Sequence, residues 1–187
     1  MKKDIILCGV GGDGIVSVAK IISDAALNIG LNVKQSEIHG MSQRGGSVFS
    51  HLRISSKPIH ADVIPQGKAD IILSSEPMEA LRYLPFLASD GIVITNSEPF
   101  INIKHYPDPS VIQSEIAKLP RCVSINANQI AKSINARGNM VLLGAAAQHL
   151  EIEFNELEKA IHNIFVRKGQ EVVDTNIAAI RAGRDNA

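Results

Sequence analysis

Cysteine is scarce in this sequence: among 187 residues there are only Cys8 and Cys122. Ferredoxin-type iron–sulfur clusters and zinc ribbons need four closely spaced cysteines, so two that lie far apart exclude both motifs. Any redox metal is therefore expected on another chain. Each cysteine is interpreted as a small buried apolar residue, and we expect both thiols to be reduced.

An excess of charge of either sign is also missing. The 19 lysines and arginines balance 19 aspartates and glutamates, so no overall basic field attracts nucleic acid, and none is expected as a partner. The N-terminal Met1-Lys2-Lys3 leads to an aspartate and a brief apolar run, unlike a signal peptide. Because no apolar run reaches about 18 residues, we expect no membrane partner and a cytoplasmic location.

Metal-ligating patterns are missing as well. His60 and Asp62 are two residues apart and His105 stands alone, so no spacing predicts a metal triad. With 45% apolar and 20% charged residues, the chain can bury a core without a disulfide or metal. We therefore expect one domain over residues 1–187.

The first informative motif is a glycine-rich turn, Gly9-Val10-Gly11-Gly12-Asp13-Gly14, which follows the apolar run of residues 5–8. Apolar residues then recur at helical spacing over residues 15–29 and end at Gly30, which predicts a helix with a C-terminal glycine. A glycine turn between a strand and a helix lets backbone N–H groups approach an anion. The same glycines also suit a tight turn without ligand, and this interpretation stays open.

The second motif follows the strand predicted over residues 32–38. It is polar and glycine-rich, and it reads His39-Gly40-Met41-Ser42-Gln43-Arg44-Gly45-Gly46. The forked guanidinium of Arg44 suits a carboxylate or phosphate, or an acid at an interface. Ser42 has no neighbouring base in sequence, so a nucleophilic role is not expected. We expect both turns to lie at the carboxyl edge of a parallel sheet, where α/β folds bind ligands.

Strands and helices alternate along the rest of the chain. Buried strands are predicted at residues 69–73, 91–95 and 122–125, with helices at 76–87 and 111–119 between them. A period of two over residues 47–54 predicts a half-exposed, antiparallel strand. After residue 126 about three helical segments break near Gly138, Glu151 and Gly169. The pattern predicts an α/β fold, a Rossmann-like doubly wound and mostly parallel sheet with additional C-terminal helices.

The first turn also has the spacing of a dinucleotide site. Gly9, Gly11 and Gly14 fit G-x-G-x-x-G, and Glu37 lies 23 residues beyond Gly14 (37 − 14), where a ribose-binding acid is expected. Asp13 argues against this site, because a carboxylate repels pyrophosphate unless it points away. We expect Asp13 to cap the following helix rather than to act as a catalytic acid.

The two turns resemble those of the gamma-type subunit of thiamine diphosphate-dependent 2-oxoacid:ferredoxin oxidoreductases, in its indolepyruvate branch. That family has G-x-G-G-Q-G where this chain has residues 9–14, with Asp13 in place of glutamine, and Q-R-G-G where it has residues 43–46. The blocks at 69–82 and 139–144 are also similar, in order and at matching separations. The likeness covers nearly the whole chain, as one domain of the pyruvate/ketoisovalerate oxidoreductase type.

The resemblance implies a small subunit without catalytic residues of its own. A large partner subunit would carry thiamine diphosphate, Mg²⁺ and iron–sulfur clusters, coenzyme A would be the co-substrate, and ferredoxin would meet the complex. This chain would bind none of these cofactors alone, and its two turns would meet the cofactors at the shared face. The residues so implied are Gly9, Gly11, Gly12, Asp13, Gly14, His39, Gly40, Ser42, Gln43, Arg44, Gly45 and Gly46.

Two other classes remain open at this point. One is a self-sufficient protein that binds NAD or FAD through the first turn and Glu37. The other is a stand-alone regulatory or scaffold module. The sequence leaves undecided which 2-oxoacid is used, whether coenzyme A touches this chain, and whether the isolated chain forms a homodimer.

Overall fold

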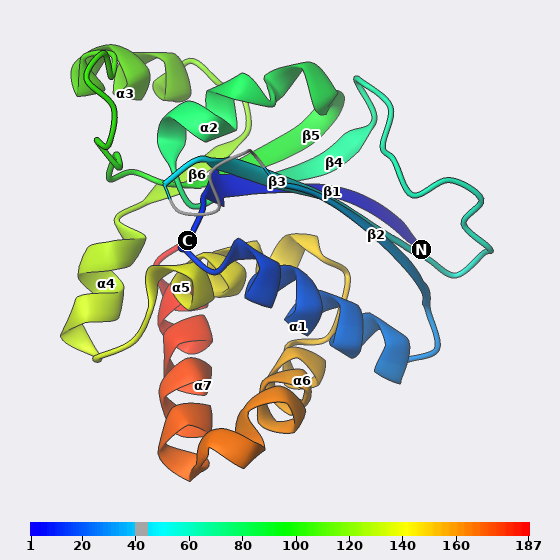
Figure 1. The fold of residues 1–187 in the computed structure, drawn as a ribbon. Coiled ribbons are helices and arrows are strands. Elements are labelled where there is room, and N and C mark those ends of the chain that lie inside the picture. Colours follow the sequence, from blue (N-terminus) through cyan, green and yellow to red (C-terminus); the bar gives the residue numbers. More distant parts are fainter. Residues whose placement is uncertain (40–44) are drawn as a thin grey trace.

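The computed structural model describes residues 1–39 and 45–187, and its centre is one six-stranded sheet between two layers of helices (Figure 1). The strand order is β2-β3-β1-β4-β5-β6. The strands are β1 (Lys2–Val10), β2 (Asn32–His39), β3 (Ser47–Ser55), β4 (Ala69–Ser74), β5 (Leu87–Asn96) and β6 (Cys122–Ile125).

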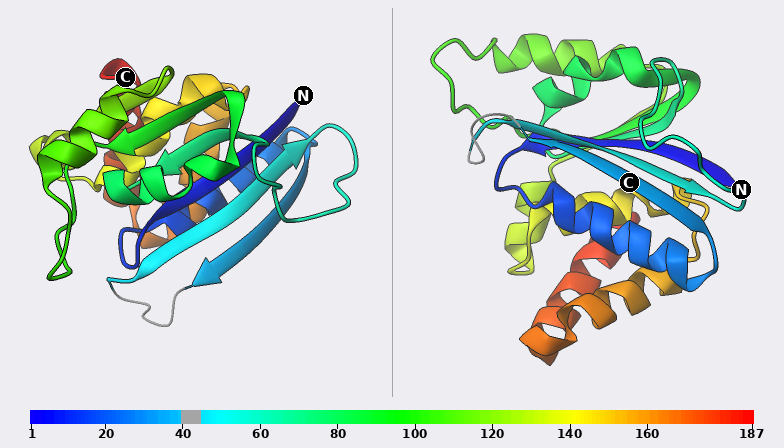
Figure 2. Two further views of the ribbon diagram at one scale, coloured as in Figure 1. Left: turned by 90° about the horizontal axis from the view of Figure 1, so that it is seen from above. Right: turned by 45° about the vertical axis from the view of Figure 1, so that its right-hand side comes forward.

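Helices cover both faces of this sheet. Two of them lie on one face and the others lie on or beside the opposite face, as the two further views confirm (Figure 2). The first group is α2 (Pro77–Arg82) and α3 (Pro109–Ala117). The second group is α1 (Ile15–Asn28), α4 (Ala127–Ser133), α5 (Gly138–Ala146), α6 (Phe154–Phe165) and α7 (Gln170–Asp185). Short 3₁₀ turns follow α2, α5 and α6 at Leu84–Phe86, Ala147–His149 and Val166–Lys168.

The sheet is mostly parallel, as predicted. β1, β4, β5 and β6 pair in parallel, whereas β3 pairs antiparallel with both β1 and β2. The predicted antiparallel strand at residues 47–54 is therefore confirmed. It lies inside the sheet rather than at its edge, and this position explains why it is more buried than its period of two indicates.

The side chains of β1 supply both hydrophobic cores. Ile5 and Leu7 point into the core beneath α1, α5, α6 and α7, and Ile6 and Cys8 point into the core beneath α2 and α3. All four are fully buried. A strand covered on both faces needs apolar side chains at every position, which accounts for the continuous apolar run in the sequence.

Several helices and strands have bounds that differ from the prediction. The helix predicted over residues 76–87 ends at Arg82, because Pro85 has no N–H to donate to the next helical carbonyl. The prediction that β5 begins at Gly91 was wrong, since the strand starts at Leu87. Gly30 has the predicted left-handed backbone just after α1, with φ +78°. The breaks predicted near Gly138, Glu151 and Gly169 separate four helices rather than three.

The carboxyl ends of β1, β4, β5 and β6 meet at one edge of the sheet, because these strands run in the same direction. The connections that follow these strands therefore gather there, together with the first residues of α1, α2 and α4. We call this side the carboxyl edge. No helix in the described ranges 1–39 and 45–187 is long and apolar enough to cross a bilayer.

Candidate functional site

At the first glycine turn the chain changes direction between β1 and α1 within four residues. Gly12 and Gly14 have φ values of +111° and +76°, which residues with a side chain rarely adopt. Gly14 is the residue that precedes the first helical turn of α1, and no side chain caps that turn. The first N–H groups of α1 therefore face the carboxyl edge without a side-chain acceptor.

The first glycine turn lies beside residues 45 and 46, the end of the second motif. The N–H of Gly11 donates to the carbonyl of Gly46 at 2.8 Å, and the N–H of Gly45 donates to the carbonyl of Gly11 at 3.0 Å. This reciprocal pair extends the antiparallel pairing of β1 and β3 beyond Val10 and Ser47. Gly40, Ser42, Gln43 and Arg44 lie outside the described residues, as does the side chain of His39, so their predicted roles stay predictions.

The structure contradicts the helix-cap prediction for Asp13. Its Oδ2 accepts a hydrogen bond from Ser75 Oγ at 2.8 Å, and the capping position of α1 belongs to Gly14. The left-handed backbone of Gly14 lies between Asp13 and the helix, and the carboxylate reaches the connection after β4 instead. Asp13 thus joins the first turn to the start of α2.

Residues at the start of α2 hold the other loops of the carboxyl edge. Glu76, 1% exposed, caps α2 by accepting from the N–H of Glu79 at 2.8 Å. Its other oxygen accepts from the hydroxyl of Tyr106 and from the N–H of Phe100. Glu79, 3% exposed, accepts from Ser47 Oγ at 2.5 Å, directly after the second turn. Two buried carboxylates three residues apart thus fix two different loops.

The buried thiol of Cys8 and the buried imidazole of His51 are structural groups. Cys8 donates weakly to the carbonyl of Glu79 at 3.7 Å, and burial raises the pKa of its thiol to about 12. A thiol with this pKa is not a nucleophile near neutral pH. His51 is 2% exposed, its ring contacts Phe49 and Phe86, and its Nδ1 accepts from the N–H of Ile64 at 3.3 Å. Cys122 is only half-buried, so the interpretation as a buried residue holds for Cys8 alone.

A cavity of about 330 Å³ opens beside the first turn at the carboxyl edge. Its walls come from the ends of β1, β4 and β5 and from the starts of α4 and α5. The lining residues include Gly12, Asp13, Ser75, Asn96, Glu98, Pro99, Phe100, Asn128, Arg137, Gly138 and Asn139. This volume is at the lower end of the usual range for ligand pockets, about 300–1,000 Å³.

The start of α5 makes one wall of this cavity positive. The helix begins at Gly138 without a side-chain cap and without an acidic residue in its first turn. Arg137, the residue just before it, is exposed, and its guanidinium makes no ion pair or hydrogen bond with residues 1–39 or 45–187. The helix end and the guanidinium together suit an anionic group.

The cavity also contains hydrogen-bond acceptors. Besides the carboxylate of Asp13, Glu98 accepts from Asn128 Nδ2 at 2.9 Å. Asn139 donates from Nδ2 to the carbonyl of Gly14 at 2.9 Å, while its buried Oδ1 has no partner in the part of the chain that the structure describes. The cavity thus combines a cationic end with acceptors for hydroxyl or amine groups, which fits a molecule that carries both phosphates and sugar hydroxyls.

Sequence reasoning missed most of the cavity wall. Ser75 and Asn96 each end or follow a predicted strand, so the rule that ligands bind at carboxyl ends of parallel strands could have found them. Arg137 has no such signal, since only the packing of α5 brings it to the edge. No three His, Cys, Asp or Glu side chains within residues 1–39 and 45–187 are placed to hold a metal ion.

The geometry does not support the dinucleotide alternative. In a Rossmann fold the strand with the ribose-binding acid lies next to β1, but here β3 lies between β1 and β2. Glu37 is in register with Ser50, and Ser50 with Leu7, so Glu37 is two strands away from β1, roughly 10 Å. It is therefore displaced from the first turn.

Comparison with known proteins identifies the family. The model of the pyruvate ferredoxin/flavodoxin oxidoreductase family matches residues 4–186. The chain belongs to this family. Full-length similarity to curated members agrees with this. The chain is 36% identical to the indolepyruvate oxidoreductase subunit IorB of Archaeoglobus fulgidus, with 100% of this chain and 96% of that protein covered. It is 38% identical to the same subunit of Methanothermobacter thermautotrophicus, with 98% and 96% covered.

Solved structures of the pyruvate ferredoxin/flavodoxin oxidoreductase family have the same fold. The pyruvate oxidoreductase subunit PORC of Thermotoga maritima superposes with a TM-score of 0.76 at 22% identity, covering 99% of this chain and 96% of that one. The 2-oxoglutarate:ferredoxin oxidoreductase of Magnetococcus marinus, solved with 2-oxoglutarate, coenzyme A and succinyl-CoA, gives a TM-score of 0.78 at 22% identity. The match covers 100% of this chain but 31% of that chain, so there the fold is part of a longer polypeptide.

Proposed function

We propose that this chain is the small subunit of a thiamine diphosphate-dependent indolepyruvate, or aryl pyruvate, ferredoxin oxidoreductase. The observation that carries the proposal is full-length similarity to subunits named for indolepyruvate, at 36% and 38% identity. The structure adds a glycine turn, hydrogen-bonded to Gly45 and Gly46, beside a polar cavity at the carboxyl edge. Its location would be the cytoplasm.

The proposed reaction is oxidative decarboxylation. A 2-oxoacid, coenzyme A and two oxidised ferredoxins give an acyl-CoA, CO₂, one proton and two reduced ferredoxins. The bond between the two carbonyl carbons breaks, and the acyl carbon forms a thioester with the sulfur of coenzyme A. Thiamine diphosphate with Mg²⁺ would supply the electron sink for decarboxylation, and iron–sulfur clusters would carry the electrons. All three would belong to a large partner subunit, and the two cysteines of this chain are too few to hold an iron–sulfur cluster.

The residues of the cavity fit the nucleotide end of coenzyme A. Arg137 and the N-terminus of α5 would hold a phosphate, whereas Asp13, Glu98 and the unpartnered Oδ1 of Asn139 would accept from ribose hydroxyls or the adenine amine. The half-exposed ring of Phe100 offers a stacking surface. A cavity of about 330 Å³ takes only part of the coenzyme, so its thiol end would reach into the partner subunit.

The two turns would form the wall that this chain contributes to the shared face. Gly11 and Gly46 hold them together, so a partner packed against one turn also covers the other. Closing this face would exclude water from the reacting groups held by the partner. The side chains of His39, Ser42, Gln43 and Arg44 would contact the partner or a cofactor there.

Co-purification tests the proposal. The tagged chain is isolated from its native cell extract and assayed for viologen or ferredoxin reduction with indolepyruvate, phenylpyruvate and pyruvate, each with coenzyme A. We expect a large iron–sulfur subunit and activity greatest with an aryl pyruvate. Recovery of the chain alone, or of a complex active only with pyruvate, would contradict the aryl pyruvate assignment.

A further inference from the structure

The connection between β5 and α3 carries an unusual group of exposed apolar side chains. Phe100, Ile101 and Ile103 are 48%, 63% and 49% exposed, within four consecutive residues. Figure 2 shows the connection extending from the body of the protein beside the carboxyl edge. Exposed single apolar residues are common, but a contiguous apolar group usually marks an interaction site. We call residues 100–103 the apolar loop.

The apolar loop is held in place at several points. Asn102 Nδ2 donates to the carbonyl of Gly45, the N–H of Phe100 donates to Glu76 Oε1 at 3.4 Å, and the hydroxyl of Tyr106 donates to the same oxygen. Glu76 is 1% exposed, so a buried carboxylate serves to anchor a surface segment. A loop that is already ordered loses less conformational entropy when a partner binds.

We propose that the apolar loop is the docking surface for the large subunit of the oxidoreductase. This inference rests on the proposed function. The loop is continuous with the cavity, since Pro99 and Phe100 line it, and it touches the second glycine turn through Gly45. A partner seated on the loop would therefore also cover the cavity and both turns.

Two observations favour the large subunit over a second copy of this chain. In the Magnetococcus marinus structure the same fold occupies 31% of a longer chain, so further parts of that enzyme are covalently attached to it. The relatives that this chain matches over nearly their full length are named as subunits, so in those enzymes other subunits are separate chains.

The test is retention of the small subunit by the tagged large subunit in the co-expressed complex after dilution. Ile101→Asp and Ile103→Asp each place a charge in the proposed interface, and we expect roughly thirtyfold weaker association. Leu27→Asp is the matched control, because Leu27 is 58% exposed on α1 and lies at the end of that helix farthest from the first turn. It should bind as the parent does. Normal retention of both loop variants would overturn the proposal.

Hydrogen exchange covers the case in which the variants do not fold. In the unmodified complex, amides of residues 100–106 should exchange at least about tenfold more slowly than in the full chain alone, whereas residues 56–68 should not change. Equal exchange at residues 100–106 would overturn the docking surface. The two proposals fail separately: an absent iron–sulfur partner contradicts both, but an active complex with normal retention of both loop variants contradicts only the surface. Loss of self-association without loss of the large subunit would assign the loop to a homodimer and overturn the proposal.

Discussion

At the residue scale, the side chains that line the cavity are of two kinds. Some already have hydrogen-bond partners in the protein, and others have none among the described residues. Asp13 and Glu98 each accept a hydrogen bond from a neighbouring side chain. The guanidinium of Arg137 has no hydrogen-bond partner among the described residues, and neither has Oδ1 of Asn139. Groups that already have partners position the wall, whereas groups that have none are free to meet a ligand.

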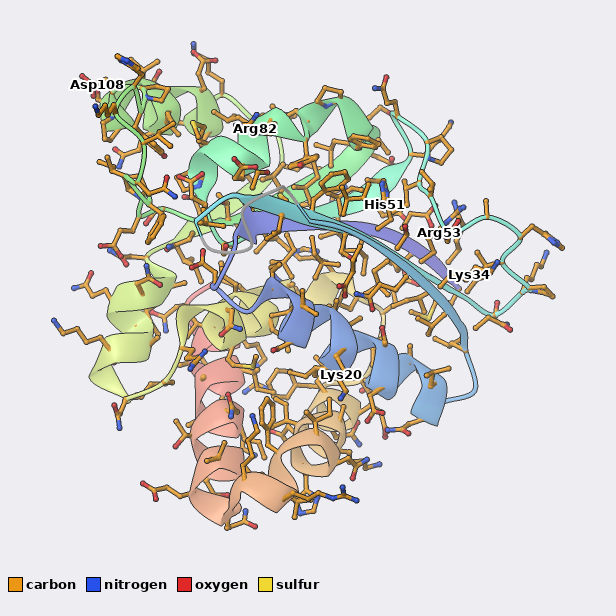
Figure 3. All side chains as sticks on the ribbon, viewed as in Figure 1. Lys20, Lys34, His51, Arg53, Arg82 and Asp108 are labelled. Carbon is orange, nitrogen blue, oxygen red and sulfur yellow. The ribbon has the colours of Figure 1, made fainter. Side chains whose placement is uncertain are left out.

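Arg137→Ala should weaken coenzyme A binding. A hydrogen bond to a charged group contributes about 1.5–3 kcal/mol, so we expect the KM for coenzyme A to rise roughly tenfold or more in the reconstituted complex. The kcat at saturating coenzyme A should change less than about twofold, because the guanidinium would hold the same phosphate in ground and transition states. Steady-state kinetics measure both constants. The control is Lys20→Ala, at an exposed cation on α1 (Figure 3), and an equal effect of both changes would remove Arg137 from the site.

His51 should make the protein less stable in mild acid. Burial lowers the pKa of its imidazole below the ordinary value of 6.5, so the unfolded chain binds the proton more readily than the folded protein. Its contribution to stability is therefore complete above about pH 6.5 and is lost as the pH falls below that value. We expect the free energy of unfolding in urea to decrease from about pH 7 to about pH 5.

The variant His51→Asn isolates this effect. The amide oxygen can still accept from the N–H of Ile64, but it does not titrate. The slope of stability against pH should become shallower, with a residual slope from His149, whose pKa burial also lowers. A matched change at the exposed His60 gives the reference slope. An unchanged slope in His51→Asn would contradict the prediction.

At the scale of elements, the position of α5 is set by its close packing against α7. A Cβ placed on Gly144 would lie 1.9 Å from the carbonyl oxygen of Ile180, and one on Gly183 would lie 1.9 Å from that of Val141. Backbone therefore meets backbone at two points between these helices. Because the start of α5 forms the positive wall of the cavity, this packing also determines where Arg137 lies.

Gly144→Ala should destabilise the protein although alanine favours helix. The gain in helix propensity is about 1 kcal/mol, but the backbone of α7 would have to move, and overpacking of this kind costs about 1–3 kcal/mol or more. We expect a clear net loss in the free energy of unfolding measured in urea. Ser114→Ala, at an exposed position of α3, should change it by less than about 0.5 kcal/mol. A Gly144→Ala variant as stable as the parent would show that α5 and α7 can separate at little cost.

At the scale of the whole molecule, the sheet order decides which ligand the first turn can serve. β3 separates β2 from β1, so Glu37 cannot stand beside the turn as the ribose-binding acid of a Rossmann fold does. The same insertion brings Gly45 and Gly46 against the first turn, because β3 begins directly after these two residues. The position of β3 between β1 and β2 thus has two consequences. The ribose-binding acid is missing beside the first turn, and the end of the second motif lies there.

The isolated full chain should therefore bind neither NAD nor FAD. We expect no saturable heat in isothermal titration up to about 1 mM dinucleotide, which corresponds to less than about 4 kcal/mol of binding free energy. A dinucleotide-dependent dehydrogenase titrated in the same buffer is the positive control. Micromolar binding with one site per chain would contradict the topological argument and revive the dinucleotide hypothesis.

The sequence alone determined those features that depend on neighbours along the chain. The apolar run before Gly9 predicts a strand buried on both faces, the helical spacing up to Gly30 predicts α1, and the period of two after Gly46 predicts an antiparallel strand. Only the tertiary structure decided the order of the strands, the partner of Asp13 and the residues of the cavity wall. Asp13 and Ser75 are 62 residues apart, and Gly14 and Asn139 are 125 apart. Contacts at such separations leave no periodic pattern in the chain, because they depend on which strand lies beside which and on how closely α5 can approach α7.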